Sequence, residues 1–151
     1  MTNVQDVPAD KLIDMMAEKL KTNEKIVAPE WAGHVKTGIH REKAPTEKDW
    51  WYRRVAAVMR KVYIYGPIGT EQLSAKFGGP RDRGSKPNRS RSGSRAIIRL
   101  SLKQLESCGY LTPYKKLGRS IAPPGQKFMD AAAREVMAEL VKTRPEMNKY
   151  A

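Results

Sequence analysis

The residues from Thr46 to Gly66 predict one long helix, and this helix constrains the fold more than any other part of the chain. Thr46 and Asp49 fit a capping-box start, while Gly66 followed by Pro67 supplies a stop. At about 100° per residue, apolar side chains that share one narrow arc predict a core-facing stripe. These residues are Trp51, Val55, Val58 and Val62.

Cations gather on a second arc of the same helix, centred roughly 130° from the apolar stripe. They are Arg53, Arg54, Arg60 and Lys61. Trp50 falls within this basic arc and has two interpretations. It could stack on an unpaired base among phosphate-binding cations, or the irregular segment Val27–Ala44 could cover it. We favour the second, because large aromatic side chains are usually well buried.

The order of the remaining elements predicts a mainly α fold. We expect helices over Pro8–Lys21, Glu71–Phe77 and Ser94–Cys108, then strands Tyr110–Tyr114 and Arg119–Ala122 joined as a hairpin. A last helix runs from Pro123 to Arg144. Their apolar stripes are Leu12, Ile13, Met16 and Leu20; Ile98, Leu102 and Leu105; and Met129, Ala133, Val136, Met137 and Leu140.

Three helices followed by a hairpin are typical of a winged-helix domain. We therefore predict a winged-helix-like three-helix core with a small β-hairpin wing, plus N-terminal and C-terminal helices. Residues 1–151 fit a single domain.

The segment Gly79–Arg95 has no apolar side chains other than two prolines, and Asp82 is its only acid. Because such a composition cannot bury itself, we predict a flexible, arginine-rich insertion at residues 79–94. A DNA-reading helix-turn-helix joins its second and third helices by a turn of about 3–4 residues. An insertion of this length favours folded RNA over DNA as the partner.

The net charge of +13 and the pI near 10.0 indicate a polyanionic partner. Arginine and lysine side chains neutralise phosphates and release counterions, which gives salt-dependent affinity. Besides Trp50 and the cations of the long helix, the candidate RNA-binding residues are Lys36, His40, Arg41 and Lys43; Arg81, Arg83, Lys86, Arg89, Arg91, Arg95 and Arg99; and Lys115, Lys116 and Arg119.

The sequence carries no pattern that predicts catalysis, a metal or a cofactor. Its two histidines lie in one loop, and no Cys or His cluster has metal-ligand spacing. The single cysteine, Cys108, excludes an internal disulfide and suits a reducing compartment. We expect no signal peptide, no membrane partner and no membrane span, which needs roughly 18 consecutive apolar residues.

Several short motifs resemble the archaeal and eukaryotic family of small-subunit ribosomal protein nineteen. They are Val35–Glu42 (VKTGIHRE), Asp49–Arg54 (DWWYRR), Gly66–Gly69 (GPIG), Gly78-Gly79, Arg83-Gly84, Gly118-Arg119, Gly125-Gln126 and Asp130. The resemblance runs from the first helix to about Asp130, and the short, alanine-rich chain is similar to archaeal members. Residues 115–117 and 122–124 depart from the family pattern at the wing and at the entry to the last helix.

The resemblance implies a winged-helix-like protein of the small-subunit head that binds ribosomal RNA and supports maturation of the subunit. It implies RNA contacts by the basic arc of the long helix and by the Arg83-Gly84 loop. Neighbouring small-subunit ribosomal proteins would be further partners. The chain would be cytoplasmic and bound to the ribosome, and it would be a monomer outside the ribosome. The alternative is a winged-helix DNA-binding transcriptional regulator; an enzyme acting on RNA is disfavoured by the missing acid–base or metal groups.

Overall fold

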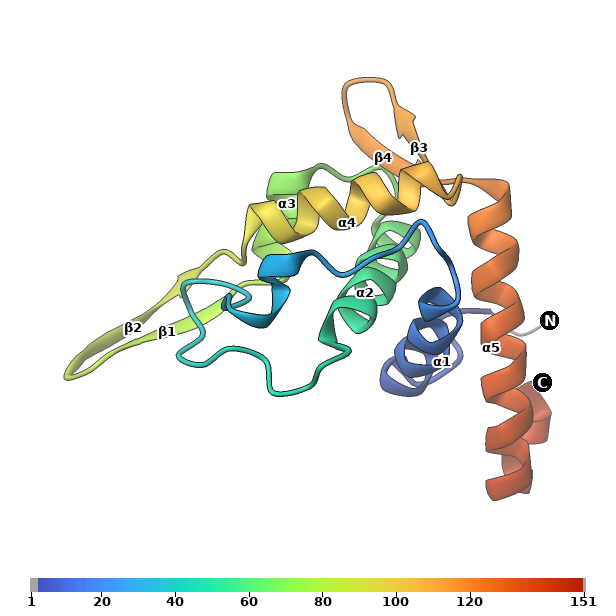
Figure 1. Cartoon of the computed structure of the whole chain (residues 1–151). Coiled ribbons are helices and arrows are strands. Elements are labelled where there is room, and N and C mark those ends of the chain that lie inside the picture. Colours follow the sequence, from blue (N-terminus) through green and yellow to red (C-terminus); the bar gives the residue numbers. More distant parts are fainter. Residues whose placement is uncertain (1–2, 151) are drawn as a thin grey trace.

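The structure, a computed structural model, describes residues 3–150 and is mainly helical, with two antiparallel hairpins (Figure 1). This confirms the predicted mainly α, winged-helix-like class. The elements in chain order are α1 (Ala9–Lys21), a 3₁₀ turn (Glu30–Gly33), α2 (Trp50–Tyr65), α3 (Thr70–Lys76), β1 (Gly79–Arg83), β2 (Lys86–Arg91), α4 (Arg95–Ser107), β3 (Leu111–Tyr114), β4 (Gly118–Ile121), α5 (Pro123–Thr143) and a final 3₁₀ turn (Pro145–Tyr150).

The core forms where α2 packs between α1 and α4, with α5 against the outer side of α1 (Figure 1). Trp51, Val55, Val58 and Val62 of α2 are fully buried, which confirms the predicted stripe. The stripes of α1, α4 and α5 meet it, because side chains three and four residues apart share one helix face. Ile13 is the exception, since it is only partly buried at the edge of the core.

Helix α2 begins three residues later than the capping-box pattern predicts, with Asp49 rather than Thr46 before its first residue. The first helical residue is Trp50, and no side chain caps the helix at Asp49. The nearby carboxylates bind cations instead: Glu47 accepts from Arg53 at 2.6 Å, and Asp49 accepts from Lys21 at 2.6 Å. The prediction of a start at Thr46 was wrong: Asp49, the acid of the predicted box, is itself the residue before the helix, and its carboxylate binds Lys21 rather than a backbone amide.

Strands β3 and β4 form the predicted wing and attach it to the helical core. Ile68, just before α3, exchanges two backbone hydrogen bonds of 3.1 Å with Arg119 on β4. Gly118 has a φ of +125°, and a Cβ there would lie 2.3 Å from the Ile68 carbonyl oxygen. The close approach of these two backbones therefore requires glycine at the start of β4, next to the turn of the wing.

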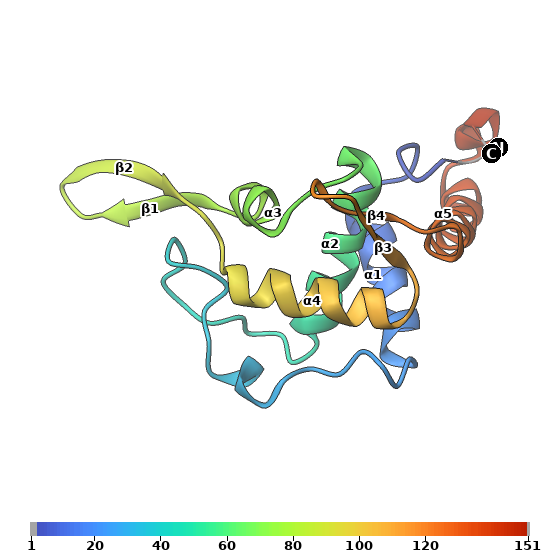
Figure 2. The ribbon, with the colours of Figure 1, turned by 90° about the horizontal axis from the view of Figure 1, so that it is seen from above.

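The arginine-rich insertion contains a second hairpin that the sequence analysis did not predict. Strands β1 and β2 pair antiparallel, with Gly84 in the turn and every residue of β2 exposed. This hairpin projects from the end of the helical body that lies opposite α5 (Figures 1 and 2). Its exposure agrees with the reasoning that the segment buries nothing, while its flexibility stays a prediction.

The base of this hairpin is fixed to α3 by one buried serine. Ser74 Oγ donates to the Gly93 carbonyl oxygen at 2.6 Å, and the Gly93 amide donates to the Ser74 carbonyl oxygen at 2.9 Å. Gly93 also pairs with Gly38 as an isolated bridge. Ser74 therefore holds the start of the hairpin between α3 and the loop near Gly38.

We expect Ser74→Ala to lower the free energy of unfolding by about 1–3 kcal/mol, because the Gly93 carbonyl would lose a buried donor. Urea denaturation followed by circular dichroism measures this change. Ser107→Ala is the control, since its exposed hydroxyl bonds only to Gln104 O within its own helix. Equal midpoints for the two variants would contradict this account.

Candidate nucleic-acid interface

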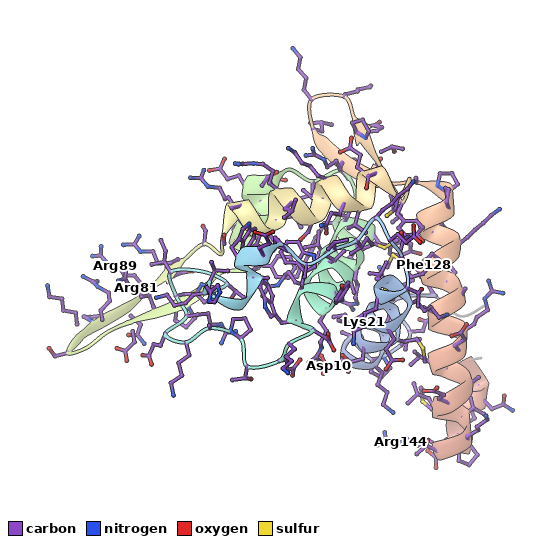
Figure 3. The ribbon with its side chains drawn as sticks, in the orientation of Figure 1. Asp10, Lys21, Arg81, Arg89, Phe128 and Arg144 are labelled. Atoms are coloured by element: carbon purple, nitrogen blue, oxygen red, sulfur yellow. The ribbon has the colours of Figure 1, made fainter. Side chains whose placement is uncertain are left out.

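One face of the β1–β2 hairpin carries its three exposed arginines. Arg81 lies directly opposite Arg89 in the ladder, so both side chains share a face. Arg91 lies two residues from Arg89 and joins that face. Figure 3 shows Arg81 and Arg89 side by side on the projecting hairpin.

This basic surface continues onto the body of the protein at the base of the hairpin. Arg81, Lys36 and Arg95 line one hollow of about 560 Å³, and Arg99 follows Arg95 by one turn on α4. We call this surface the arginine face. It consists of Lys36, Arg81, Arg89, Arg91, Arg95 and Arg99, all exposed.

The arginine face has no internal neutralisation. None of its six cations forms an ion pair with any of the residues 3–150. Asp82, the acid of the segment, accepts from the Gly84 amide at 2.9 Å instead. Like charges placed directly opposite destabilise a strand pair, so Arg81 and Arg89 weaken the free hairpin. A polyanion laid along this face would remove that repulsion.

The other basic residues of the hairpin lie near its turn. Arg83 and Lys86 are paired, and the register shifts between Arg81 and Arg83. Arg83 is half-buried and its Nη1 donates to the Pro87 carbonyl oxygen at 3.4 Å, whereas Lys86 is exposed. The predicted contact of the Arg83-Gly84 loop with RNA stays a prediction, with Lys86 as its most open cation.

The basic arc of α2 is less open than the sequence analysis expected. Arg53 pairs with Asp14 at 2.8 Å and Glu47 at 2.6 Å, and these carboxylates raise its pKa. Lys61 donates to the Lys76 carbonyl oxygen at 2.6 Å, and Arg60 is half-buried with an Nε that has no hydrogen-bond partner. Arg53 and Lys61 therefore bind α1 and α3 in the free protein.

Arg54 and Lys61 both lie over the ring of Phe77. The Arg54 guanidinium carbon is 4.6 Å from the ring centroid and the Lys61 Nζ is 4.2 Å from it. Burial lowers the pKa of Arg54, and the neighbouring Arg41 lowers it further. The sequence analysis missed Phe77 as a site residue, because no local signal links it to residues 16–23 positions upstream.

A groove of about 800 Å³ lies between the loop Thr37–Glu47, the start of α2 and the hairpin. Six residues of the predicted set line it: His40, Arg41, Lys43, Trp50, Arg53 and Arg54. The His40 ring fits tightly against glycine backbone, since a Cβ on Gly38 would lie 2.7 Å from its Nδ1. Burial, then Arg41 and Arg54, lower the pKa of His40, so the ring favours its neutral form.

Trp50 is 9 % exposed, and its Nε1 donates to the Ala32 carbonyl oxygen at 3.2 Å. It packs edge-on against Trp51, with ring centroids 5.6 Å apart. The preceding segment covers this side chain, as the favoured interpretation required. Stacking of a full base on Trp50 would require that segment to move.

The wing presents a smaller basic surface. Lys115 and Lys116 are exposed at its tip, beside the exposed side chains of Tyr114 and Leu117. Arg119 is engaged, because its Nε lies 3.3 Å from Glu106 Oε2 on α4. The two tip lysines are therefore free to contact a partner, whereas Arg119 connects the wing to the core.

The structure also bears on metal binding, on membrane crossing and on the single cysteine. Within residues 3–150, no group of three His, Cys, Asp or Glu side chains is placed to hold a metal ion. Among the helices in that range, none combines the length and apolarity that crossing a bilayer demands. Cys108 is half-buried against the core, and burial raises its pKa.

Comparison with known proteins identifies the chain at the level of its family. The family model of ribosomal protein S19e matches residues 3–139. The small ribosomal subunit protein eS19 of Thermoplasma acidophilum is 43% identical over 150 residues, covering 99% of both chains. The eS19 of Aeropyrum pernix is 44% identical over 152 residues with the same coverage. The eS19A of Schizosaccharomyces pombe is 37% identical over 137 residues, covering 91% of this chain and 95% of that protein. The extent of these matches, with archaeal relatives over the full length, shows that the chain belongs to the ribosomal protein S19e family in its archaeal form.

Proposed function

We propose that this chain is a structural protein of the small ribosomal subunit that binds ribosomal RNA through the arginine face. The observation that carries the proposal is the pairing of Arg81 with Arg89 on a hairpin whose second strand buries none of its residues. Such a ribbon gains nothing from packing and loses stability from repulsion. A phosphate backbone bound along the ribbon would neutralise the repelling arginines and contact the exposed strand. Both properties of the hairpin therefore favour binding to nucleic acid.

The geometry suits the outside of folded RNA. The major groove of an RNA helix is too deep and narrow for side chains to read, so proteins grip phosphates and 2′-hydroxyls instead. Guanidinium groups bind phosphate oxygens with two parallel hydrogen bonds. The hairpin arginines, together with Arg95 and Arg99 on α4, present such groups along one surface. Lys115 and Lys116 at the wing tip offer a second, smaller contact.

Two finer parts of the proposal follow from the family. The members of the family are ribosomal proteins, which are structural rather than catalytic. The relatives of this chain are named as small-subunit proteins. We infer that this chain lies on cytoplasmic ribosomes, beside other ribosomal proteins, in the head of the small subunit, the position that the resemblance of its sequence motifs implies. Support of RNA maturation and subunit assembly belongs to the same proposal. The family membership favours this role over DNA-binding regulation.

The salt dependence of RNA binding tests the proposal. If the six cations of the arginine face each neutralise one phosphate, log affinity should fall against log salt with a slope of roughly 4–5. Fluorescence anisotropy with small-subunit ribosomal RNA between 50 and 400 mM KCl, a range chosen around the usual working salt, measures this slope. Removing one hairpin arginine should reduce the slope by about one. A flat salt response would exclude the proposed phosphate contacts.

A further inference from the structure

The groove on the other side of the hairpin differs chemically from the arginine face. It is lined by Arg41 and Arg54, by Asp82 and Asn88 of the hairpin, and by the ring of Phe77. Its volume of about 800 Å³ falls within the roughly 300–1,000 Å³ of small-ligand sites. Cations, hydrogen-bonding groups and an aromatic ring therefore converge in a space sized for a small molecule rather than a helix.

Two arginines of the groove have no carboxylate partner, whereas a third, Arg53, is paired with Asp14 and Glu47. Neither Arg41 nor Arg54 forms an ion pair within residues 3–150. Three carboxylates line the groove: Glu47 binds Arg53, Asp82 Oδ1 accepts from the Gly84 amide, and the exposed Glu42 forms no ion pair within residues 3–150. Arg41 is close enough to Arg54 to lower the pKa of its guanidinium. Both arginines line the same groove, so one anionic group bound there would neutralise both.

The remaining walls suit a flat aromatic group. Arg54 already stacks on Phe77, with 4.6 Å between the guanidinium carbon and the ring centroid. Guanidinium planes and aromatic rings are the surfaces on which unpaired bases stack. Asn88 and Asp82 supply both a donor and acceptors for a base edge. A duplex, whose bases are paired and stacked internally, has no such group to offer.

We propose that this groove takes a single unpaired nucleotide of RNA, with its phosphate between Arg41 and Arg54 and its base beside Phe77 and Asn88. The inference rests on the proposed function and deepens it. The arginine face binds the RNA backbone independently of sequence. The groove binds only where one unpaired nucleotide projects from the RNA helix. The hairpin lies between the two surfaces, so one strand pair contacts both features of the RNA.

The test compares two RNA hairpins that differ by one bulged nucleotide, bound to the full chain and followed by anisotropy. Wild-type protein should bind the bulged RNA about tenfold more tightly, the range expected for one stacked base. Arg41→Gln should remove this preference while the affinity for the paired hairpin changes little. Lys48→Gln is the matched control, because Lys48 is exposed on the same loop and outside the groove. A preference that survives in Arg41→Gln, or that disappears in Lys48→Gln, would overturn the inference.

Photo-cross-linking is a second test, and because it uses the wild-type protein it does not depend on whether a variant folds. With 4-thiouridine as the bulged nucleotide, photo-cross-links should map to residues 40–57 or 77–88. Cross-links to the wing or α5 alone would contradict the groove as the binding site. The two proposals fail separately: wild type that binds neither RNA refutes the proposed function, whereas equal binding of both RNAs refutes only the nucleotide site.

Discussion

Replacing Arg81, Arg89 and Arg91 together by glutamate is expected to abolish binding to small-subunit ribosomal RNA. Each charge-assisted hydrogen bond contributes roughly 1.5–3 kcal/mol, so the loss of three lowers affinity by about a thousandfold or more. The glutamates would also repel the phosphates that the arginines attract. Anisotropy at fixed salt measures the affinity, and sucrose-gradient sedimentation shows whether the variant still enters the small subunit.

The matched control is the triple change Lys127→Glu, Arg134→Glu and Lys142→Glu. These three cations are exposed on α5, at the end of the molecule opposite the hairpin (Figure 2). Both triple variants carry the same net charge, so a difference between them reports the position of the charges rather than their sum. If the α5 variant loses as much affinity as the hairpin variant, the interaction is non-specific and the arginine face is not the contact.

Folding should be unaffected in the hairpin variant, and the structure gives the reason. The three arginines are exposed and form no ion pair within residues 3–150. Glutamates at positions 81 and 89 replace one like-charged pair across the ladder by another, so the repulsion within the hairpin is about the same as in the wild type. Circular dichroism and the thermal midpoint of the free protein should therefore match the wild type. A lower midpoint would show that these side chains support the fold.

Helical periodicity predicted the body of this protein well because its stripes are dense and regular. The stripe on α2 and that on α4, from Ile98 to Leu105, both lie in the core. The wing was also predictable, since Gly118 marks its turn and Leu111, Tyr114 and Ile121 flank that turn. The β1–β2 hairpin was not, because its strands alternate no apolar residues and contain Pro80 and Pro87.

The candidate site was predictable in composition but not in arrangement. Charge clustering identified the arginines of residues 79–95, and the structure adds that Arg81, Arg89 and Arg91 share one face. A helical wheel placed Arg53 and Arg54 together as free cations. It could not show that Arg53 would pair with Asp14 of α1, or that Arg54 would lie over Phe77, because both partners are distant in the chain.

Replacing Trp51 by alanine is expected to lower the free energy of unfolding by about 3–5 kcal/mol, the largest effect of any single change proposed for the fold. Trp51 is fully buried, with the ring of Trp31 5.8 Å away in an edge-on contact. Its Nε1 donates to Gln104 Oε1 at 3.0 Å, while Gln104 Nε2 donates to the Val27 carbonyl oxygen at 2.7 Å. The Trp51 side chain thus links α2 to Gln104 of α4 and, through Gln104, to the segment that covers Trp50.

Since a whole domain is stabilised by only about 5–15 kcal/mol, Trp51→Ala should leave a marginal fold in urea denaturation. Trp31→Ala is the matched control, because that ring is 38 % exposed and leaves a smaller cavity. Its expected cost is about 1 kcal/mol, in the ordinary range of partly exposed positions. Trp51→Phe helps to separate the two contributions, because it removes the donor to Gln104 but keeps an aromatic ring and leaves a smaller cavity than alanine. Equal losses for Trp51→Ala and Trp31→Ala would mean that the three-way junction at Trp51 does not hold the helices together.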